Sequence, residues 1–491
     1  MKTGVIGSGI GGLAIAIRLA LRGNEVTVFE KNEQPGGKIS QLFADGYRFD
    51  TGPSLFTLPH LVEELFTLAG KKREDYLAYQ RIETNCRYYF PDGTDFVFYR
   101  DEDRLRSEIR EKTNEDPQHV FRRLARSKQV YEIGAPVFLF SNFHKLSNFN
   151  TPPFKKVALK LHKLDFFRTM HGANSADFED WRFVRIFDRY ATYNGSNPYK
   201  APATLNMIAH LENNVGTYFP KRGMYDIVNS LYKLAQETGV GFRFRTKVEE
   251  IGMKHRQVTG LRTGEGFIPF DCVVSDVDVC YAANCLMEPS PYRHRLNRAE
   301  PSSSALIFYW GINRTFPELD LHNILFASDY KQEFNDLFTR KTIHHDPTIY
   351  IFISSKLVPD DAPEGCENWF VMVNAPADSG QDWDKLIRKT RAAIIRKINK
   401  SLHVTIEKCI VNEHVASPLT IERNTLSRYG ALYGASSNSM FSAFLRHPNV
   451  IGSIKNLYFV GGSVHPGGGI PLCLASALIV DHEIAARVGD E

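Results

Sequence analysis

A run of glycines near the amino terminus has the spacing of a loop that binds a dinucleotide. Residues 7–12 (GSGIGG) form the pattern G-x-G-x-x-G, which indicates such a site only in the right context. That context is present: residues 4–6 form an apolar strand, residues 13–22 carry Ala and Leu at helical spacing, and Glu30 ends a second apolar strand, 25–30. The glycines let backbone N–H groups at the helix start approach a pyrophosphate, and Glu30 can accept hydrogen bonds from both ribose hydroxyls. The sequence therefore predicts a dinucleotide site that disfavours a 2′-phosphate.

Two segments that follow favour FAD over NAD. Gly36-Gly37 precedes Lys38, and NAD-binding proteins have no need of a second glycine pair at this place. In FAD oxidoreductases of the amine-oxidase-like superfamily, a glycine pair with a cation at this spacing lies beside the diphosphate. Residues 46–54 (GYRFDTGPS) resemble that superfamily's D-x-G-P turn, which brings backbone close to the isoalloxazine ring. Asp50 in this turn either holds the backbone amides of the loop or touches the cofactor.

A second glycine-rich junction between a strand and a helix lies near the carboxyl terminus. Residues 456–460 are the strand, residues 461–469 are the loop, and a helix follows. Backbone amides at such a junction point at an electron-rich group. In a flavin this is the N1–C2=O edge, where negative charge develops on reduction. Residues 456–471 resemble the signature of the bacterial phytoene desaturase family, N-x-aromatic-apolar-x-G-small-small-small-H-P-G-small-G-apolar, from whose usual residues Val464 and Gly468 depart.

Three internal segments extend this resemblance over nearly the whole chain. Residues 218–224 (YFPKRGM) resemble the family's Y-x-P-x-G-G-M loop, with Arg222 in place of the first glycine. Val248 lies in an alternating strand, at the position whose backbone usually meets adenine. Residues 273–278 (VVSDVD) resemble the family's VVSNAD turn with two substitutions, of which Asp276 is one.

Together these motifs predict FAD, held without a covalent bond, as the cofactor. The residues expected to contact it are Gly7, Gly9, Ile10, Gly11, Gly12, Glu30, Lys31, Gly36, Gly37, Lys38, Gly52, Pro53, Ser54, Val248, Asp276, Gly461, Gly462, Gly469, Ile470 and Pro471. The seven scattered cysteines contain no C-x-x-C pair and predict neither a metal site nor a disulfide framework. The net charge of +4, spread over 491 residues, gives no reason to expect a nucleic-acid partner.

The positions of the motifs predict an α/β fold with a discontinuous, Rossmann-type FAD-binding domain. Its expected segments are residues 1–75, 215–295 and 450–491. Residues 76–214 and 296–449 are expected to form an interleaved substrate domain with a mixed sheet, which either forms a cavity wall or packs in the core. The apolar or alternating strands expected in this sheet are residues 305–312, 348–354 and 369–373.

Residues 100–190 are expected to be helical, and one helix among them has two unlike faces. The apolar face comprises Phe154, Val157, Ala158, Leu161 and Leu164. The opposite face carries Lys155, Lys156, Lys160 and Lys163. This pattern is typical of a helix in an anionic membrane interface, although a surface helix packed on the core shows it too. No apolar run reaches the ~18 residues of a membrane span, and no leader precedes the first strand. We therefore expect a cytoplasmic protein, peripheral on the inner face of the membrane.

The resemblance implies a carotenoid desaturase. Such an enzyme removes two hydrogens from adjacent carbons, one as hydride to flavin N5 and one as a proton, and passes the electrons to oxygen or a quinone. The conjugated polyene stabilises the allylic cation, so a strong base is not required. Asp188 and Arg189 belong to a segment that in the family lines the cavity near the ring, where polar groups could steer a hydroxylated end group. Together with His322 they are the candidate catalytic residues, and the alternative for each is a structural role.

Several activities share these motifs. Residues 49–56 (FDTGPSLF) and 374–377 (NAPA) resemble most the C-3,4 desaturases of γ-carotene or its 1′-hydroxy derivative. A phytoene desaturase or a carotenoid isomerase is the alternative within the family. A prenyl-binding escort protein is expected to have eroded flavin loops, whereas both loops here are intact. An amine oxidase commonly links its flavin to a cysteine of the last loop, and residues 461–471 hold none.

Overall fold

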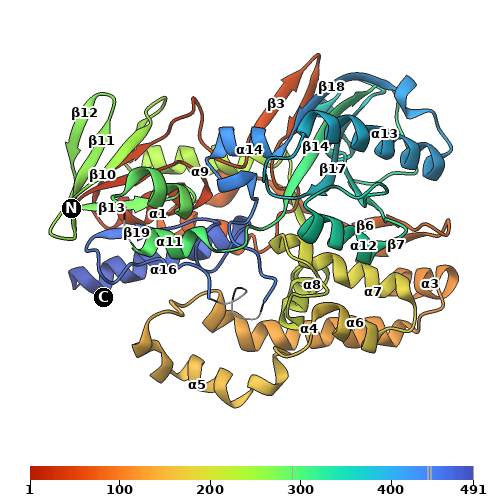
Figure 1. Cartoon of the computed structure of the whole chain (residues 1–491), viewed down its shortest axis with the longest axis horizontal. Coiled ribbons are helices and arrows are strands. Elements are labelled where there is room, and N and C mark those ends of the chain that lie inside the picture. The colour runs from red at the N-terminus through yellow and green to blue at the C-terminus, as the bar shows by residue number, and fades with distance from the viewer. Residues whose placement is uncertain (290, 440–441, 443–444, 490–491) are drawn as a thin grey trace.

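Two sheets that share no strand organise the computed structural model, which describes residues 1–289, 291–439, 442 and 445–489. A helical segment lies below the sheets in Figure 1, and both chain ends lie beside the smaller sheet. No helix within the described residues is long and apolar enough to cross a membrane.

The smaller sheet has five parallel strands in the order β19-β13-β1-β2-β9. Its strands are β1 (Lys2–Ile6), β2 (Glu25–Phe29), β9 (Gly241–Arg243), β13 (Cys272–Ser275) and β19 (Leu457–Phe459). Strands of parallel sheets are apolar because helices cover them. The helices of this layer are α1 (Ile10–Leu21), α9 (Tyr225–Glu237) and α16 (Ile470–Val488), and α1 contacts both of the others. All five strands come from the ranges expected for the FAD-binding domain.

Two further sheets have three or more strands. An antiparallel sheet next to the first consists of β10 (Val248–Lys254), β11 (Gln257–Thr263) and β12 (Gly266–Pro269). The seven-stranded sheet has the order β18-β14-β17-β16-β15-β6-β7 and is mixed, because β15 pairs with β6 in parallel. Its strands are β6 (Thr84–Tyr89), β7 (Asp95–Tyr99), β14 (Ser304–Ile312), β15 (His322–Leu325), β16 (Ile349–Phe352), β17 (Glu367–Ala375) and β18 (Ile410–Ala416).

The seven-stranded sheet uses its two faces differently. Successive side chains of a strand point to opposite faces. Leu306, Phe308 and Trp310 of β14 pack in one core with Ile394 of α13 (Trp383–Leu402). The intervening side chains face the other way. The strands expected in this sheet are confirmed. The sequence left open whether the sheet forms a cavity wall or packs in the core, and each of its two faces takes one of these roles.

The helical segment packs against one end of the seven-stranded sheet. Its helices are α3 (Glu102–Lys112), α4 (Pro117–Phe138), α5 (Pro152–Leu159), α6 (Met170–Asp177), α7 (Trp181–Asp188) and α8 (Met207–Ala209). Shorter helices and strands elsewhere are β3 (Gln41–Ala44), β4 (Tyr47–Asp50), α2 (His60–Leu68), β5 (Tyr79–Arg81), β8 (Tyr218–Pro220), α10 (Val279–Tyr281), α11 (Pro291–Asn297), α12 (Tyr330–Asn335) and α14 (Pro418–Thr425). Of these, β3 with β4 and β5 with β8 form two-stranded sheets.

The apolar stripe of residues 154–164 faces mainly inward, which corrects its expected role. Phe154, Val157 and Leu164 are buried in a cluster with Val130 and Val137 of α4. The lysines lie on the outer side as expected. Periodicity identifies the apolar side of a helix, but it does not tell whether protein or lipid covers that side.

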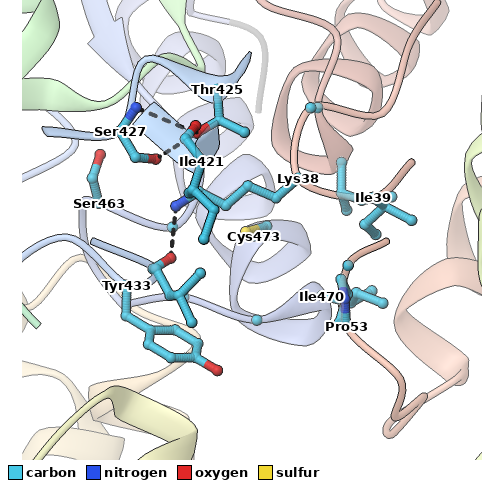
Figure 2. Close-up of a pocket in the computed structure, with 18 of the residues that line it drawn as sticks. Lys38, Ile39, Pro53, Ile421, Thr425, Ser427, Tyr433, Ser463, Ile470 and Cys473 are labelled. Atoms are coloured by element: carbon cyan, nitrogen blue, oxygen red, sulfur yellow. Dashed lines mark hydrogen bonds between the residues drawn. The ribbon is translucent and has the colours of Figure 1, made fainter. Parts of the chain in front are cut away.

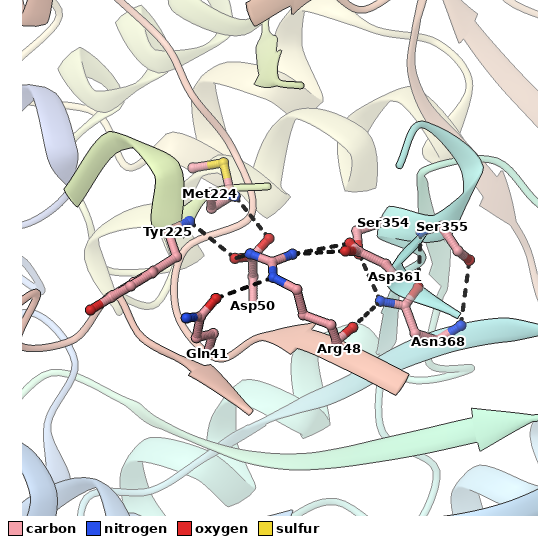
Figure 3. A network of polar contacts seen from close by, with 9 residues as sticks. All are labelled: Gln41, Arg48, Asp50, Met224, Tyr225, Ser354, Ser355, Asp361 and Asn368. Carbon is pink, nitrogen blue, oxygen red and sulfur yellow. Dashed lines mark hydrogen bonds and ion pairs between the residues drawn. The ribbon is translucent and has the colours of Figure 1, made fainter. Parts of the chain in front are cut away.

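A buried ion network joins the D-x-G-P turn to the start of α9 and to β17 of the seven-stranded sheet (Figure 3). Arg48 donates to Asp50 at 2.8 Å and to Asp361 at 3.0 Å. The other bonds of Asp50 come from the backbone N–H groups of Met224 at 2.8 Å and Tyr225 at 3.0 Å, where α9 begins. Asp50 therefore holds backbone amides, but those at the start of α9 and not those of its own loop, and it does not line the cavity described below.

Candidate flavin and substrate site

One continuous cavity of about 960 Å³ is lined by both glycine-rich loops, the D-x-G-P turn and the seven-stranded sheet. Eighteen of the twenty residues expected at the cofactor line it, and the exceptions are Gly12 and Gly461. A Cβ atom at Gly12 would collide with the carbonyl oxygen of Gly7, so this glycine lets α1 pack against the loop. A Cβ atom at Gly461 would collide with the carboxylate of Asp276.

Glu30 lies at the end of β2, and its carboxylate accepts hydrogen bonds that hold the first glycine loop in place. Its Oε2 accepts hydrogen bonds from the backbone N–H of Ser8 at 3.0 Å and from the Ser8 hydroxyl at 2.8 Å. Its Oε1 accepts one from the backbone N–H of Asn32 at 2.9 Å. A carboxylate oxygen accepts about two hydrogen bonds. Oε1 can therefore take one more, as a ribose hydroxyl would require.

The two lysines expected at the cofactor hold the loops together. Lys38 donates to the carbonyl oxygen of Leu432 at 2.6 Å, a contact drawn in Figure 2. Burial lowers the pKa of Lys38, and the nearby carboxylates of Asp278 and Asp276 oppose this shift. Lys31 donates to the side chain of Asn32 at 3.0 Å. Both lysines line the cavity, so each can also meet an anionic ligand there.

The second glycine loop ends at the start of α16. Gly469 precedes this helix with φ +104°, a conformation that favours glycine, and a Cβ atom there would meet nothing within 4 Å. The first backbone N–H groups of a helix have no partner within it and attract electron-rich groups. The open space beside Gly469 and these donors fit a flavin ring. With the first glycine loop, Glu30 and Val248, they form a site that would hold FAD.

The inner face of the seven-stranded sheet forms the cavity wall that was one of the two alternatives for these strands, and it supplies lining residues that the sequence did not identify individually. Its cavity-lining side chains alternate along neighbouring strands: Ala305, Ile307 and Tyr309 of β14, Tyr350 of β16, and Phe370 and Met372 of β17. The three strands are far apart in sequence, so only their pairing in the sheet brings these side chains together. The alternation within each strand was the available signal.

A buried ion pair with three tyrosines forms a polar patch beside this wall, with Tyr88 from β6 and the other four residues from the helical segment. Arg189 donates to Glu212 at 2.6 Å and to the hydroxyl of Tyr88 at 2.8 Å. Tyr190 and Tyr193 also donate to Glu212. Arg189, Tyr193 and Glu212 line the cavity. Arg189 therefore lies at the cavity, as expected from the sequence, and it is also salt-bridged. We call Arg189, Glu212, Tyr88, Tyr190 and Tyr193 the Arg189 cluster.

The other two candidate catalytic residues do not line the cavity. Asp188 is buried and pairs with His171 at 2.6 Å and with Asn174 at 2.8 Å, so it has a structural role. His322 of β15 lies on the same face of the sheet as Tyr350 and is buried there, with Nδ1 2.8 Å from the hydroxyl of Tyr350. Burial lowers the pKa of His322 to about 3, which keeps its imidazole neutral.

The interleaved domains and the two glycine loops on one cavity define a flavin-dependent oxidoreductase. Residues 10–480 match the family of flavin containing amine oxidoreductases, and the chain belongs to this family. It is therefore an oxidoreductase with FAD as its cofactor. An oxidoreductase from Methanosarcina mazei of known structure superposes with a TM-score of 0.63 at 14% identity, covering 98% of this chain and 100% of that one. The expected fold class is confirmed.

Two relatives of assigned activity match over nearly their whole length. The chain is 46% identical over 478 residues to a 1-hydroxycarotenoid 3,4-desaturase of Flavobacterium sp. (strain P99-3), covering 97% of this chain and 98% of that protein. It is 33% identical over 493 residues to a 4,4′-diapolycopene oxygenase of Methylomonas sp, covering 98% and 97%. The family expected from the motifs is confirmed.

Proposed function

We propose that this protein is an FAD-dependent carotenoid desaturase that introduces the C-3,4 double bond into a 1′-hydroxycarotenoid such as 1′-hydroxy-γ-carotene, or into γ-carotene. The observation that carries the proposal is the 46% identity to a 3,4-desaturase over the whole cavity-forming chain. The cavity also has the two parts that such a substrate needs, an apolar wall beside the flavin loops and a polar patch next to that wall.

The apolar wall matches a rigid polyene. The alternate side chains Ile307, Tyr309, Phe370 and Met372 present one face of a sheet, along which an extended chain can lie. Burial of such a chain excludes water from the reacting carbons. The bound flavin supplies the two-electron oxidation. The wall positions the C3–C4 bond, and small displacements cost rate in such reactions.

The Arg189 cluster is placed to bind the substrate hydroxyl. The hydroxyl of 1′-hydroxy-γ-carotene is on C1′, and the new double bond forms between C3′ and C4′ of the same end of the molecule, so the group that holds the hydroxyl must lie close to the flavin. Ser54 in the D-x-G-P turn is 2.6 Å from the hydroxyl of Tyr350, and both residues line the cavity together with Arg189 and Glu212. The cluster and the turn thus face the same cavity. Arg189 can donate to a hydroxyl oxygen, and Glu212 can accept the hydroxyl proton in a hydrogen bond.

The substrate is tested with purified FAD-loaded protein in liposomes and with oxygen or a quinone as electron acceptor. We expect 1′-hydroxy-γ-carotene or γ-carotene to give a product that absorbs at longer wavelength, because one more double bond joins the conjugated system. Phytoene should stay colourless, since its flexible saturated segments do not fit a wall that holds a straight chain. Colour from phytoene alone would support the phytoene desaturase alternative. No change with any of the three would favour an escort protein.

We also propose that the protein binds the cytoplasmic face of the membrane through the surface that contains α5. This surface differs from the stripe expected from sequence. Its exposed apolar side chains are Phe149, Leu159, Leu161 and Phe167, of which Leu159 is 81% and Phe167 88% exposed. Lys155, Lys156 and Lys163 are exposed beside them, and Lys160 is half-buried. Apolar side chains next to lysines are suited to an anionic lipid surface.

Changing the four lysines Lys155, Lys156, Lys160 and Lys163 to Gln should weaken sedimentation with anionic vesicles at least about tenfold, because each lysine near the surface contributes about 1 kcal/mol. Leu159→Ser with Phe167→Ser should weaken it by a similar factor. Added salt should release the wild type. Phe43→Ser is the matched control, since Phe43 is 66% exposed on β3, away from α5. Equal sedimentation of all variants would contradict the proposed membrane surface.

A further inference from the structure

The carboxylate of Asp276 lies within the first glycine loop. Asp276 follows β13, and a Cβ atom placed on Gly9 would be 2.5 Å from its Oδ2. A Cβ atom on Gly11 would be 2.5 Å from its Oδ1. The backbone N–H groups of Gly9 and Gly12 face this carboxylate and act to lower its pKa. In a G-x-G-x-x-G loop this end of the helix binds the pyrophosphate of the dinucleotide. The carboxylate of Asp276 thus lies among backbone N–H donors that the diphosphate also requires.

The charges around Asp276 do not neutralise it. Glu30 faces it from the end of β2 and raises its pKa, whereas Lys38 and the backbone N–H groups of the loop lower it. Cys473 of α16 also faces it. The ammonium group of Lys38 is shared with Asp278 and donates to the carbonyl oxygen of Leu432. Burial is the largest effect, and it raises the pKa of Asp276 to about 7.

We propose that FAD binds the form of the protein in which Asp276 carries a proton, so that cofactor binding in alkaline solution takes up a proton at this side chain. The diphosphate carries two negative charges, and a charged Asp276 beside it would be repelled without a water shell to screen it. A neutral carboxylic acid removes the repulsion and can donate its proton to a phosphate oxygen. This inference rests on FAD as cofactor and is independent of the carotenoid substrate.

The direction in which pH changes the Kd for FAD follows from the protonation of Asp276 in the protein without and with the cofactor. Asp276 titrates near pH 7 without the cofactor, and the bound diphosphate raises its pKa further. Below this range Asp276 is already protonated, so the Kd for FAD should not change with pH. Above it a proton must be taken up, and the Kd should rise by up to about tenfold per pH unit.

Proton uptake can be counted directly by titrating cofactor-stripped protein with FAD in a calorimeter. The titration is run near pH 8 in two buffers of different ionisation enthalpy. The wild type should take up close to one proton per FAD. Asp276→Asn should take up none and should bind FAD about tenfold more tightly than the wild type at this pH, because Asn keeps the size of the side chain but not its charge. Near pH 6 the two proteins should have similar Kd values.

Asp278→Asn is the matched control, since Asp278 is a buried neighbour that also lines the cavity. This variant should keep the proton uptake. The proposal is overturned if the wild type takes up no proton, if Asp276→Asn still takes one up, or if Asp278→Asn abolishes the uptake. Should Asp276→Asn fail to fold, Asp276→Ser replaces it, and the wild-type count stands on its own. If the protein proved to have no carotenoid desaturase activity, the proton counts and the Kd values for FAD would still test this proposal.

Discussion

Replacing Gly9 with valine is expected to give a folded protein that retains less than about a tenth of the wild-type FAD. The first atom of the new side chain would lie 2.5 Å from Oδ2 of Asp276, within the space that the diphosphate has to enter. Movement of the Asp276 side chain would relieve that contact, but it would not restore the approach of the diphosphate to the backbone. The ratio of flavin absorbance to protein absorbance in purified protein measures the effect.

Gly264→Val is the control for this substitution. Gly264 lies in the exposed turn between β11 and β12, and a Cβ atom there would meet nothing within 4 Å. This variant should keep its full FAD content. Far-UV circular dichroism should show equal secondary structure in both variants. A Gly9→Val protein with normal flavin content would contradict the assignment of the diphosphate to this loop.

Replacing Arg189 with methionine should lower the free energy of unfolding by about 3 kcal/mol or more, because Glu212 would remain as a buried charge without its partner. The carboxylate is 3% exposed and loses its hydrogen bond of 2.6 Å from Arg189. Urea denaturation of the FAD-loaded protein, followed by circular dichroism, measures this change. The same variant should lose the preference for a hydroxylated substrate.

The double variant Arg189→Met with Glu212→Gln separates stability from substrate preference. It removes both charges. Tyr190 and Tyr193 bond different oxygens of Glu212, so the new amide oxygen can accept from one of them while the amide NH2 donates to the hydroxyl oxygen of the other, and at least half of the lost stability should return. The preference for 1′-hydroxy-γ-carotene over γ-carotene, measured as a ratio of kcat/KM values, should stay at least about tenfold below that of the wild type. Restored preference in the double variant would show that the Arg189 cluster only supports the fold.

The flavin site could be predicted because its signals are local in sequence. The G-x-G-x-x-G loop needs a strand, a helix and Glu30, all within about thirty residues. The same holds for residues 456–471 at the second loop. Backbone donors and glycine conformations carry the function there, so residue type and spacing describe the site directly.

The substrate side could be predicted less well because its contacts are not local. Tyr309, Tyr350 and Phe370 meet only through the pairing of three strands. Asp188 and Arg189 are neighbours in sequence, yet one faces His171 and the other the cavity. Helical periodicity identified the stripe that contains Phe154 but could not tell that α4 covers it. Leu159 and Phe167, which are exposed instead, follow no helical pattern.

The order of strands in the five-stranded sheet has a consequence for how the protein is made. β13 lies between β1, which a ribosome synthesises first, and β19, which it synthesises long afterwards. Until β19 and α16 emerge, the nascent chain exposes one edge of β13 and an apolar side of α1 that α16 later covers. Pairing of such distant segments is slow. We therefore expect the flavin site to become complete only after β19 and α16 have been translated. Until then, we expect the unfinished chain to depend on chaperones.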